Sequence, residues 1–272
     1  MEKPLTKLVI PIHDIVNFCF CPLYYKIKKN FTRKNMKDKY TMDILWCIYQ
    51  YMNRFSNLNT SGIAFLKKCW GIRWIEDKTV KKIATVASSV KRDTYNTKRV
   101  NGLDALINFH NLIDGNESHC IMSGKSFEVE ILPGIFVSGT WDLIQEVNDG
   151  AGIKIIKIIP ESNKFEIKHS IRYNIEVTLM YYAFITMFDS LDKEVSISVY
   201  DLQKNKEWPT ERTEDDIKIL KNTVETMIYC VNHNIMLLSP DKKCYHCDVR
   251  HLCEKSIYDD GKLKKLRRKN YE

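Results

Sequence analysis

The sequence has little glycine and proline, with 10 Gly and 7 Pro in 272 residues. This composition excludes collagen-like repeats and a chain made mainly of flexible linkers. No apolar run reaches the roughly 18–20 residues of a membrane-spanning helix. The first residues, MEKPLTKLVI, lack the apolar segment of a secretory signal. We therefore expect no membrane partner and a location in the reducing cytoplasm, which for a viral protein is the host cytoplasm.

The composition favours a folded protein with a basic surface. Hydrophobic residues make up 44% of the chain and aromatic residues 11%, which excludes disorder as the main state. Lys and Arg number 42 against 34 Asp and Glu, a formal net charge of +8. A surplus of this size favours a polyanionic partner, although many ordinary proteins share it. No RNA-binding signature and no zinc-finger helix spacing appear.

The hydrophobic pattern changes from helical to alternating near residue 126. Residues 12–29 predict a helix, and residues 41–113 predict several more from apolar residues spaced three and four apart. Alternation predicts strands, and Asn148-Asp149-Gly150 predicts a hairpin turn between two of them. The predicted strands are 126–132, 135–147, 152–159 and 194–202. Two further helices are predicted at 171–188 and 213–235, the second with Thr213 and Asp216 in a capping box.

This order of elements predicts an α/β fold, with a central sheet flanked by helices. No change of composition requires a second domain, so we expect one domain over residues 1–272. Its expected parts are an N-terminal arm (1–40), a helical region (41–125), an α/β core (126–239), a C-terminal cysteine motif (240–257) and a basic tail (258–272).

Nine cysteines need an explanation. An odd number of cysteines without an export signal argues against a disulfide framework. Some lie among apolar residues, where small buried side chains are expected. These are Cys47, Cys69, Cys120 and Cys230. The other five cysteines lie near the two ends of the chain.

Three of the C-terminal cysteines have the spacing of metal ligands, Cys-x2-Cys-x5-Cys from Cys244 to Cys253. A fourth thiolate is required, and Cys21, directly before a proline, is the natural candidate. Four thiolates suit either tetrahedral zinc or a [4Fe–4S] cluster, and spacing does not separate the two. His246 or His251 in place of a thiolate is a variant of the zinc site. The predicted ligands are Cys21, Cys244, Cys247 and Cys253.

These motifs resemble those of a known family. The Cys-Pro-x-x-Tyr at residues 21–25 and the cysteine motif at 244–253 resemble the iron–sulfur staple of RecB/AddB-type nucleases. In size, the chain is most similar to the CRISPR-associated exonuclease of the "Cas four" type. Gly139-Thr-Trp-Asp142 resembles the Gly-x-x-Asp strand of that family, and Lys157 stands where the family has the lysine of its Asp/Glu-x-Lys motif.

The resemblance covers residues 1–30 and 125–257, and the helix at 171–188 matches the one that follows the lysine strand. It implies a PD-(D/E)XK restriction-endonuclease-like fold with a mixed sheet. It also implies a [4Fe–4S] cluster in preference to zinc, and cleavage of DNA that depends on Mg²⁺ or Mn²⁺. The implied partners are DNA, as single strands or ends, and other proteins of a DNA-processing complex.

The active-site motif departs from the family at the position of the second carboxylate. Hydrolysis of a phosphodiester needs carboxylates that hold Mg²⁺, and a lysine that stabilises charge. Asp142 and Lys157 fit these roles, but Ile155 stands two residues before the lysine, where the second carboxylate is expected. A dead site would leave a DNA-binding or assembly subunit. Alternatively, Glu176 on the next helix takes the vacant role, and we name it as a metal ligand beside Asp142.

Other candidates for the site are weaker. Glu128 or Glu130, on the preceding strand, could contribute the carboxylate in place of Glu176. The family also has an upstream metal-ligand histidine. In this chain Ala105 stands at the matching position, and His110 is the nearest substitute.

Basic runs and aromatic residues provide candidate contacts to DNA. The runs lie at 26–34, 78–82 and 262–269. The aromatic candidates for stacking on unpaired bases are Trp70, Trp74, Tyr24 and Tyr25. The alternative for each is a solvated lysine or an aromatic residue of the core. A zinc-stapled module that binds another protein is a third alternative for the whole chain.

Overall fold

The structure is a computed structural model. It describes residues 7–30, 36–54, 62–75, 89–114, 119–160, 171–240, 244–245, 247 and 249–253. The predicted basic runs at 78–82 and 262–269 lie outside these ranges, as do His246 and residues 31–34.

The chain divides into two compact units. The first comprises Met1–Arg33, Glu130–Val137 and Lys218–Glu272, and the second comprises Lys34–Val129 and Ser138–Ile217. The candidate catalytic residues belong to the second unit and the four candidate cysteines to the first.

The described elements follow the predicted order of helices, three strands, a helix, a strand and a helix, with two strands added that the sequence did not predict, β1 and β6. The helices are α1 (Ile12–Phe20), α2 (Pro22–Asn30), α3 (Met36–Arg54), α4 (Gly62–Trp70), η2 (Gly71–Ile75), α6 (Ser89–Asp114), η3 (Asn148–Gly150), α8 (Ile175–Met187) and α9 (Glu214–Asn232). The strands are β1 (Leu8–Pro11), β2 (His119–Leu132), β3 (Ile135–Val147), β4 (Gly152–Ile159), β5 (Glu194–Asp201) and β6 (Lys206–Thr210).

The strands form one mixed sheet in the order β1-β3-β4-β5-β6, with β2 also paired to β3. β3 and β4 are antiparallel, β4 and β5 are parallel, and β5 and β6 are antiparallel. Both strands of the β3–β4 hairpin have the predicted bounds. The turn between them contains three positive φ angles, at Asn148 (54°), Asp149 (50°) and Gly150 (91°), which these residue types tolerate.

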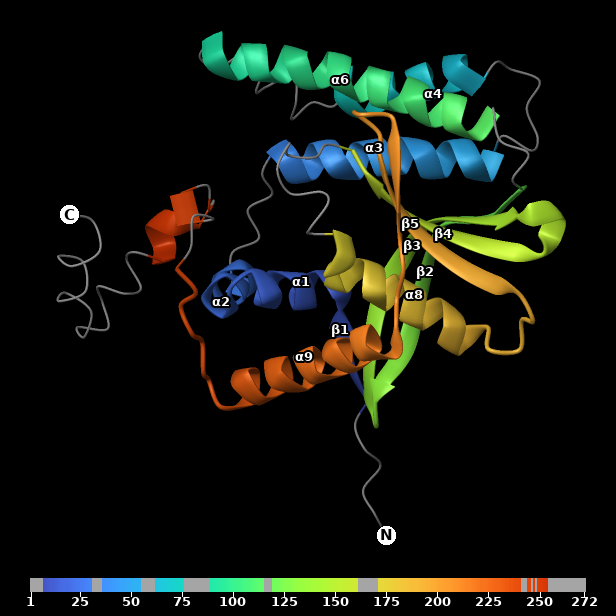
Figure 1. Ribbon diagram of the computed structural model, residues 1–272. Helices are drawn as coiled ribbons and strands as arrows, with labels where there is room; N and C mark the ends of the chain where they lie inside the picture. Colours follow the sequence, from blue (N-terminus) through green and yellow to red (C-terminus); the bar gives the residue numbers. More distant parts are fainter. Residues whose placement is uncertain are drawn as a thin grey trace. The chain divides into compact units, whose positions relative to one another are not determined.

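Within the second unit, helices cover both faces of the sheet. α3, α4 and α6 pack on one face through a core that includes Leu143, Ile156 and Tyr200, while α8 packs against β4 and β5 (Figure 1). Trp70 and Trp74 stack on each other in this core, with ring centroids 5.1 Å apart. Both rings are buried, so they serve as core residues and offer no surface for stacking bases.

In the first unit, the predicted helix at 12–29 is two helices. α1 ends at Phe20, Cys21 is extended, and α2 starts at Pro22. The Cys21 amide donates to Asn17 O (3.1 Å), while the Cys21 carbonyl accepts from the Tyr25 amide (3.0 Å). Proline fits the first turn of a helix because its missing N–H would have no partner there. Cys21 therefore lies at the joint of two helices.

Within the described ranges, none of the helices is both long and apolar enough to cross a membrane.

Candidate functional site

Three residues from separate elements meet in the second unit. The Nζ atom of Lys157 on β4 donates to Oε1 of Glu176 on α8, at 2.7 Å. The same Nζ atom lies 3.1 Å from Oδ2 of Asp142 on β3. The sequence analysis proposed these three residues for one catalytic site, and the structure brings their side chains together. We call them the Asp–Lys–Glu cluster.

Asp142 lies where β3 parts from β4. The paired residues of the two strands end at Leu143 and Ile156. Beyond this point the backbone amide of Ile158 on β4 donates to Oδ2 of Asp142 at 2.9 Å. The Asp142 carboxylate thus takes the place of a backbone acceptor from β3. Side chains alternate along a strand. Since Ile156 and Ile158 face the core with α3, α4 and α6, Lys157 faces α8.

Glu176 is fixed by the start of α8. The sequence predicts a helix from 171, but the helix begins at Ile175 because Asn174 caps it. The Asn174 side chain accepts from the amides of Glu176 (2.9 Å) and Val177 (3.1 Å). An asparagine cap satisfies amides that have no partner inside the helix. It sets Glu176 in the first turn, where its negative charge also suits the helix dipole.

The charges of the cluster hold Lys157 in its protonated form. Burial alone would lower the pKa of Lys157, but the nearby charges of Asp142 and Glu176 outweigh burial and raise its pKa above the ordinary value. The two carboxylates therefore share one permanent cation.

Tyr49 is a member of the site that sequence reasoning missed. Its hydroxyl on α3 donates to Oδ1 of Asp142 at 2.7 Å. Burial, followed by the charge of Asp142, raises the pKa of Tyr49, so the hydroxyl stays protonated as a donor. Gly124, at a φ of +61°, makes room for the ring, because a Cβ there would lie 2.6 Å from Cγ of Tyr49. No periodicity in the sequence marks this tyrosine.

The other carboxylate candidates occupy different surroundings. The side chains of Glu128 and Glu130 are exposed on β2, and Oε1 of Glu130 accepts from the Gly134 amide at 2.7 Å in its own hairpin. Ile155, at the expected carboxylate position, is fully buried.

His110 on α6 is paired with another helix. Its Nδ1 lies 2.9 Å from the hydroxyl of Tyr51, and a Cβ on Gly62 would lie 3.0 Å from the ring. Ala105, which was expected at the position of the histidine, is fully buried. The proposed role of His110 as a metal ligand therefore gains no support from these contacts.

The four candidate cysteines all belong to the first unit. Cys21 is buried, and Cys244, Cys247 and Cys253 are half-buried. The Cys247 amide donates to the Cys244 carbonyl at 3.4 Å, which is the tight turn that a Cys-x2-Cys pair needs to share a ligand. The Cys253 amide closes a helical turn on Val249 O at 2.9 Å.

The side chains of these four cysteines are not gathered into one metal-binding group in this structure. Among the residues that the structure describes, no three His, Cys, Asp or Glu side chains gather as a metal site would require. All nine cysteines lie in the described part of the chain, and none forms a disulfide. The metal centre remains a prediction from the cysteine spacing.

Comparison of the chain with models of known protein families gives no match, and comparison with curated proteins gives none either. The assignment of function therefore rests on the residues and their geometry.

Proposed function

We propose that the protein is a PD-(D/E)XK nuclease-like protein that binds DNA and hydrolyses its phosphodiester bonds at the Asp–Lys–Glu cluster. The convergence of Asp142, Lys157 and Glu176 carries this proposal. Residues 34 positions apart on β3 and α8 supply two carboxylates to one point, as a catalytic carboxylate displaced from β4 to the helix would require.

The donor set suits a hard divalent cation. Mg²⁺ is commonly held by one or two carboxylates together with phosphate oxygens. Asp142 and Glu176 already converge on one cationic atom, Nζ of Lys157, and they would hold Mg²⁺ or Mn²⁺ in the same region. A bound cation of this kind supplies an activated water and neutralises phosphate charge.

Lys157 has a role of its own. An ammonium group has three donors. Two of them are directed at Asp142 and Glu176, which leaves a third for a phosphate oxygen. Because its pKa is raised, Lys157 is charged at neutral pH and stabilises negative charge on that phosphate. Tyr49 orients the Asp142 carboxylate through Oδ1.

A second candidate is DNA binding without cleavage, in a protein that assembles with other DNA-processing proteins. Two observations favour it. Ile155 removes one carboxylate, and both oxygens of Asp142 are already occupied by Tyr49, Lys157 and the Ile158 amide. In that case the cluster is a structural ion pair and the nuclease fold serves as a platform for DNA.

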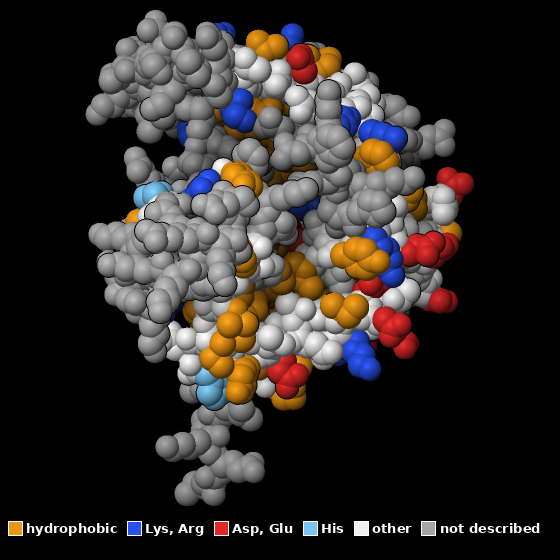
Figure 2. Space-filling model, turned by 60° about the vertical axis from the view of Figure 1, so that its left-hand side comes forward, with side chains coloured by type: hydrophobic (Ala, Val, Ile, Leu, Met, Phe, Trp, Pro, Cys, Tyr) orange, Lys and Arg blue, Asp and Glu red, His pale blue; other side chains and the backbone are white. Residues whose placement is uncertain are grey.

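The surface described by the structure gives limited support for DNA binding. On the face drawn in Figure 2, lysine and arginine side chains are interspersed with acidic and hydrophobic ones. The formal charge of +8 favours DNA for the chain as a whole. We place the protein in the cytoplasm, where the cysteines stay reduced.

The test of cleavage is digestion of end-labelled single- and double-stranded DNA with Mg²⁺, Mn²⁺ or EDTA. We expect metal-dependent cleavage that Asp142→Asn and Glu176→Gln each abolish. The matched control is Glu207→Gln. Glu207 pairs at 2.8 Å with Lys154, which lies on β4 like Lys157, and the Glu207 side chain is 26% exposed against 30% for Glu176. Binding without cleavage supports the second candidate. Cleavage that survives Asp142→Asn contradicts the site.

We further propose that Cys21 and the three C-terminal cysteines bind a [4Fe–4S] cluster that ties the two ends of the chain together. Anaerobic purification should give iron, sulfide and a broad visible absorption, which Cys21→Ser removes. Cys19→Ser, an exposed cysteine two residues away, is the control that keeps them. Zinc in place of iron supports the zinc alternative, and absence of both contradicts the centre.

A further inference from the structure

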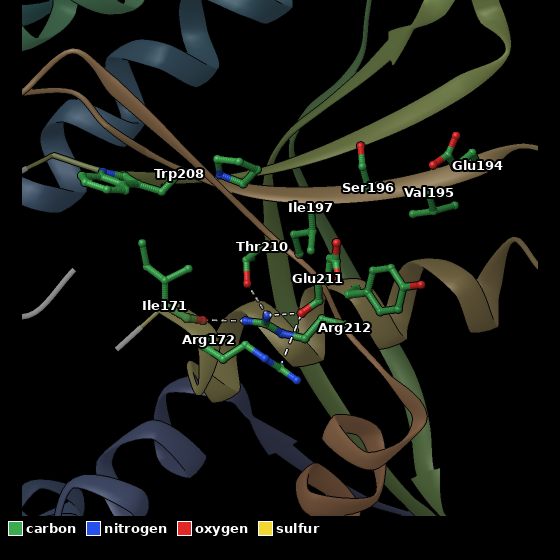
Figure 3. A pocket seen from close by; sticks show the side chains of 12 residues that line it. Ile171, Arg172, Glu194, Val195, Ser196, Ile197, Trp208, Thr210, Glu211 and Arg212 are labelled. Atoms are coloured by element: carbon green, nitrogen blue, oxygen red, sulfur yellow. Dashed lines mark hydrogen bonds between the residues drawn. The ribbon is translucent and has the colours of Figure 1, made fainter. Parts of the chain in front are cut away.

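The second unit contains a groove whose lining includes none of the residues of the Asp–Lys–Glu cluster. It has a volume of about 670 Å³ and runs between α8 and the strands β5 and β6 (Figure 3). Figure 3 shows Trp208 toward one end and Arg172 and Arg212 in the middle. The lining also includes apolar side chains of Ile171, Val195 and Ile197. Nothing in the proposed cleavage reaction uses this groove.

The strand register places Trp208 in line with Lys157. Lys157 pairs with Val199 on β5, and Val199 pairs with Trp208 on β6. Paired residues project from the same face of a sheet, and neighbouring strands lie about 4.8 Å apart. Trp208 is therefore on the α8 face of the sheet, about 10 Å from Lys157 by this spacing.

The indole of Trp208 is half-buried in the lining of the groove. Nζ of Lys206 lies over the ring, 3.9 Å from its centroid. The Nε1 atom is buried without a hydrogen-bond partner, so it is out of reach of a ligand. The part of the side chain that remains exposed offers an aromatic surface for stacking.

Two arginines, each held by hydrogen bonds, line the middle of the groove. Arg212 is buried and donates to Thr178 Oγ1 (2.8 Å) and to Ile171 O (2.8 Å). Burial lowers the pKa of Arg212 to about 10, so it remains a cation at neutral pH. Nη1 of Arg172 is held by Asp216 Oδ1 at 2.6 Å, and the side chain is 42% exposed.

The charges in the groove are mixed. Glu194 and Glu211 line it together with the two arginines, so it does not resemble a channel for a rigid, fully charged duplex. Sites for single strands combine aromatic side chains, on which bases stack, with cationic side chains that contact the backbone.

We propose that this groove binds an unpaired nucleotide of a DNA strand, with its base stacked on Trp208, next to the nucleotide held at the Asp–Lys–Glu cluster. The proposal rests on the proposed function and adds to it a subsite for one stacked base. Arg172 binds the phosphate that follows.

The test measures binding of fluorescently labelled oligo(dT) and of a duplex of equal length by anisotropy, in EDTA so that no cleavage occurs. Trp208→Ala should weaken binding of the single strand by roughly 5- to 150-fold, the factor expected for loss of one stacked base. Duplex binding should change less than twofold. Trp208→Phe, which keeps a smaller ring for stacking, should fall between wild type and Trp208→Ala.

The matched control is Trp46→Phe. Trp46 lies on α3, outside the groove, and is half-buried. The Arg73 guanidinium lies 4.3 Å from the centroid of its ring, so a cation covers this ring as Lys206 covers that of Trp208. It should bind oligo(dT) like wild type, and circular dichroism should show both Phe variants folded. Equal affinities for Trp208→Phe, Trp208→Ala and wild type would overturn the groove.

The outcomes separate the two proposals. A wild type that binds oligo(dT) through Trp208 but does not cut DNA contradicts cleavage and supports the groove. A wild type that cuts DNA while Trp208→Ala binds normally contradicts the groove and leaves the cluster intact. Absence of any DNA binding contradicts both.

Discussion

Replacing Lys157 by methionine tests the Asp–Lys–Glu cluster without any assumption about DNA. In the native protein, the Lys157 side chain is 16% exposed and that of Asp142 3% exposed. Removing the ammonium leaves the Asp142 carboxylate buried with the Tyr49 hydroxyl and the Ile158 amide as its donors. Breaking a buried ion pair on one side costs about 3–5 kcal/mol. Because Glu176 is 30% exposed and water can solvate it, we expect a loss near 3 kcal/mol, the lower end of that range.

The pH dependence adds a second criterion. The pKa of Lys157 is raised above its ordinary value by the charges of Asp142 and Glu176, which outweigh burial. Its contribution to stability is therefore complete below the unfolded-state pKa of about 10.4 and is lost as the pH rises through the higher folded-state pKa. The wild type should lose stability above about pH 10.4. Lys157→Met should lack that part of the alkaline loss.

Urea unfolding followed by circular dichroism measures both effects. The matched control is Lys154→Met on the same strand, whose pair with Glu207 spans 2.8 Å with side chains 31% and 26% exposed. A pair this exposed is worth about 0–1 kcal/mol. Equal losses for the two variants, or an unchanged alkaline step in Lys157→Met, would refute the assignment of Lys157 as the buried cation of the cluster.

Two further predictions concern hydrogen bonds to buried carboxylates. Tyr49→Phe removes a donor to the Asp142 carboxylate and should cost about 1.5–3 kcal/mol in urea unfolding, the range for a hydrogen bond to a charged group. Tyr51→Phe, on the same helix, loses its bond to the His110 ring and should cost about 0.5–1.5 kcal/mol. The reverse order would contradict the role of Tyr49. Burial raises the pKa of Asp216, but hydrogen bonds from the Thr213 amide and the Arg172 guanidinium outweigh burial and lower the pKa. The contribution of Asp216 to stability is therefore present above about pH 3.9 and is lost as the pH falls through the lower folded-state pKa. Thermal unfolding from pH 6 to pH 2 should therefore show a smaller acid-induced decrease in Asp216→Asn than in wild type, and equal decreases would exclude this contribution.

Local patterns in the sequence were sufficient for the β3–β4 hairpin and for the start of α9. Alternating side chains and a turn of Asn148, Asp149 and Gly150 define both strands of the hairpin. One half of the predicted capping box is confirmed, since Asp216 Oδ2 accepts from the Thr213 amide at 2.8 Å; the Thr213 hydroxyl donates to the same oxygen at 3.0 Å. These features depend on residues within a few positions of one another.

Features that depend on distant or competing contacts were not predictable. β6 was missed because it is short and contains Pro209, which lowers strand propensity and suits an edge position. Pro22 indicated a helix end at this point, but the start of a second helix at Pro22 itself was missed because the apolar stripe continues through it. Tyr49 donates to a carboxylate 93 residues away, and nothing local to α3 indicates that contact. Glu176 could be nominated as a replacement carboxylate, but its distance from Lys157 required the fold.

The joint between α1 and α2 does not tolerate an inserted or deleted residue. The amide of Cys21 closes one helix and its carbonyl opens the next, so no spare residue separates them. An extra residue beside it would turn α2 by about 100° around its own axis. That rotation would carry the Tyr25 ring away from Phe18, which it now meets edge-on at 6.2 Å. Natural variants of this protein should therefore change side chains at this joint far more readily than they gain or lose a residue.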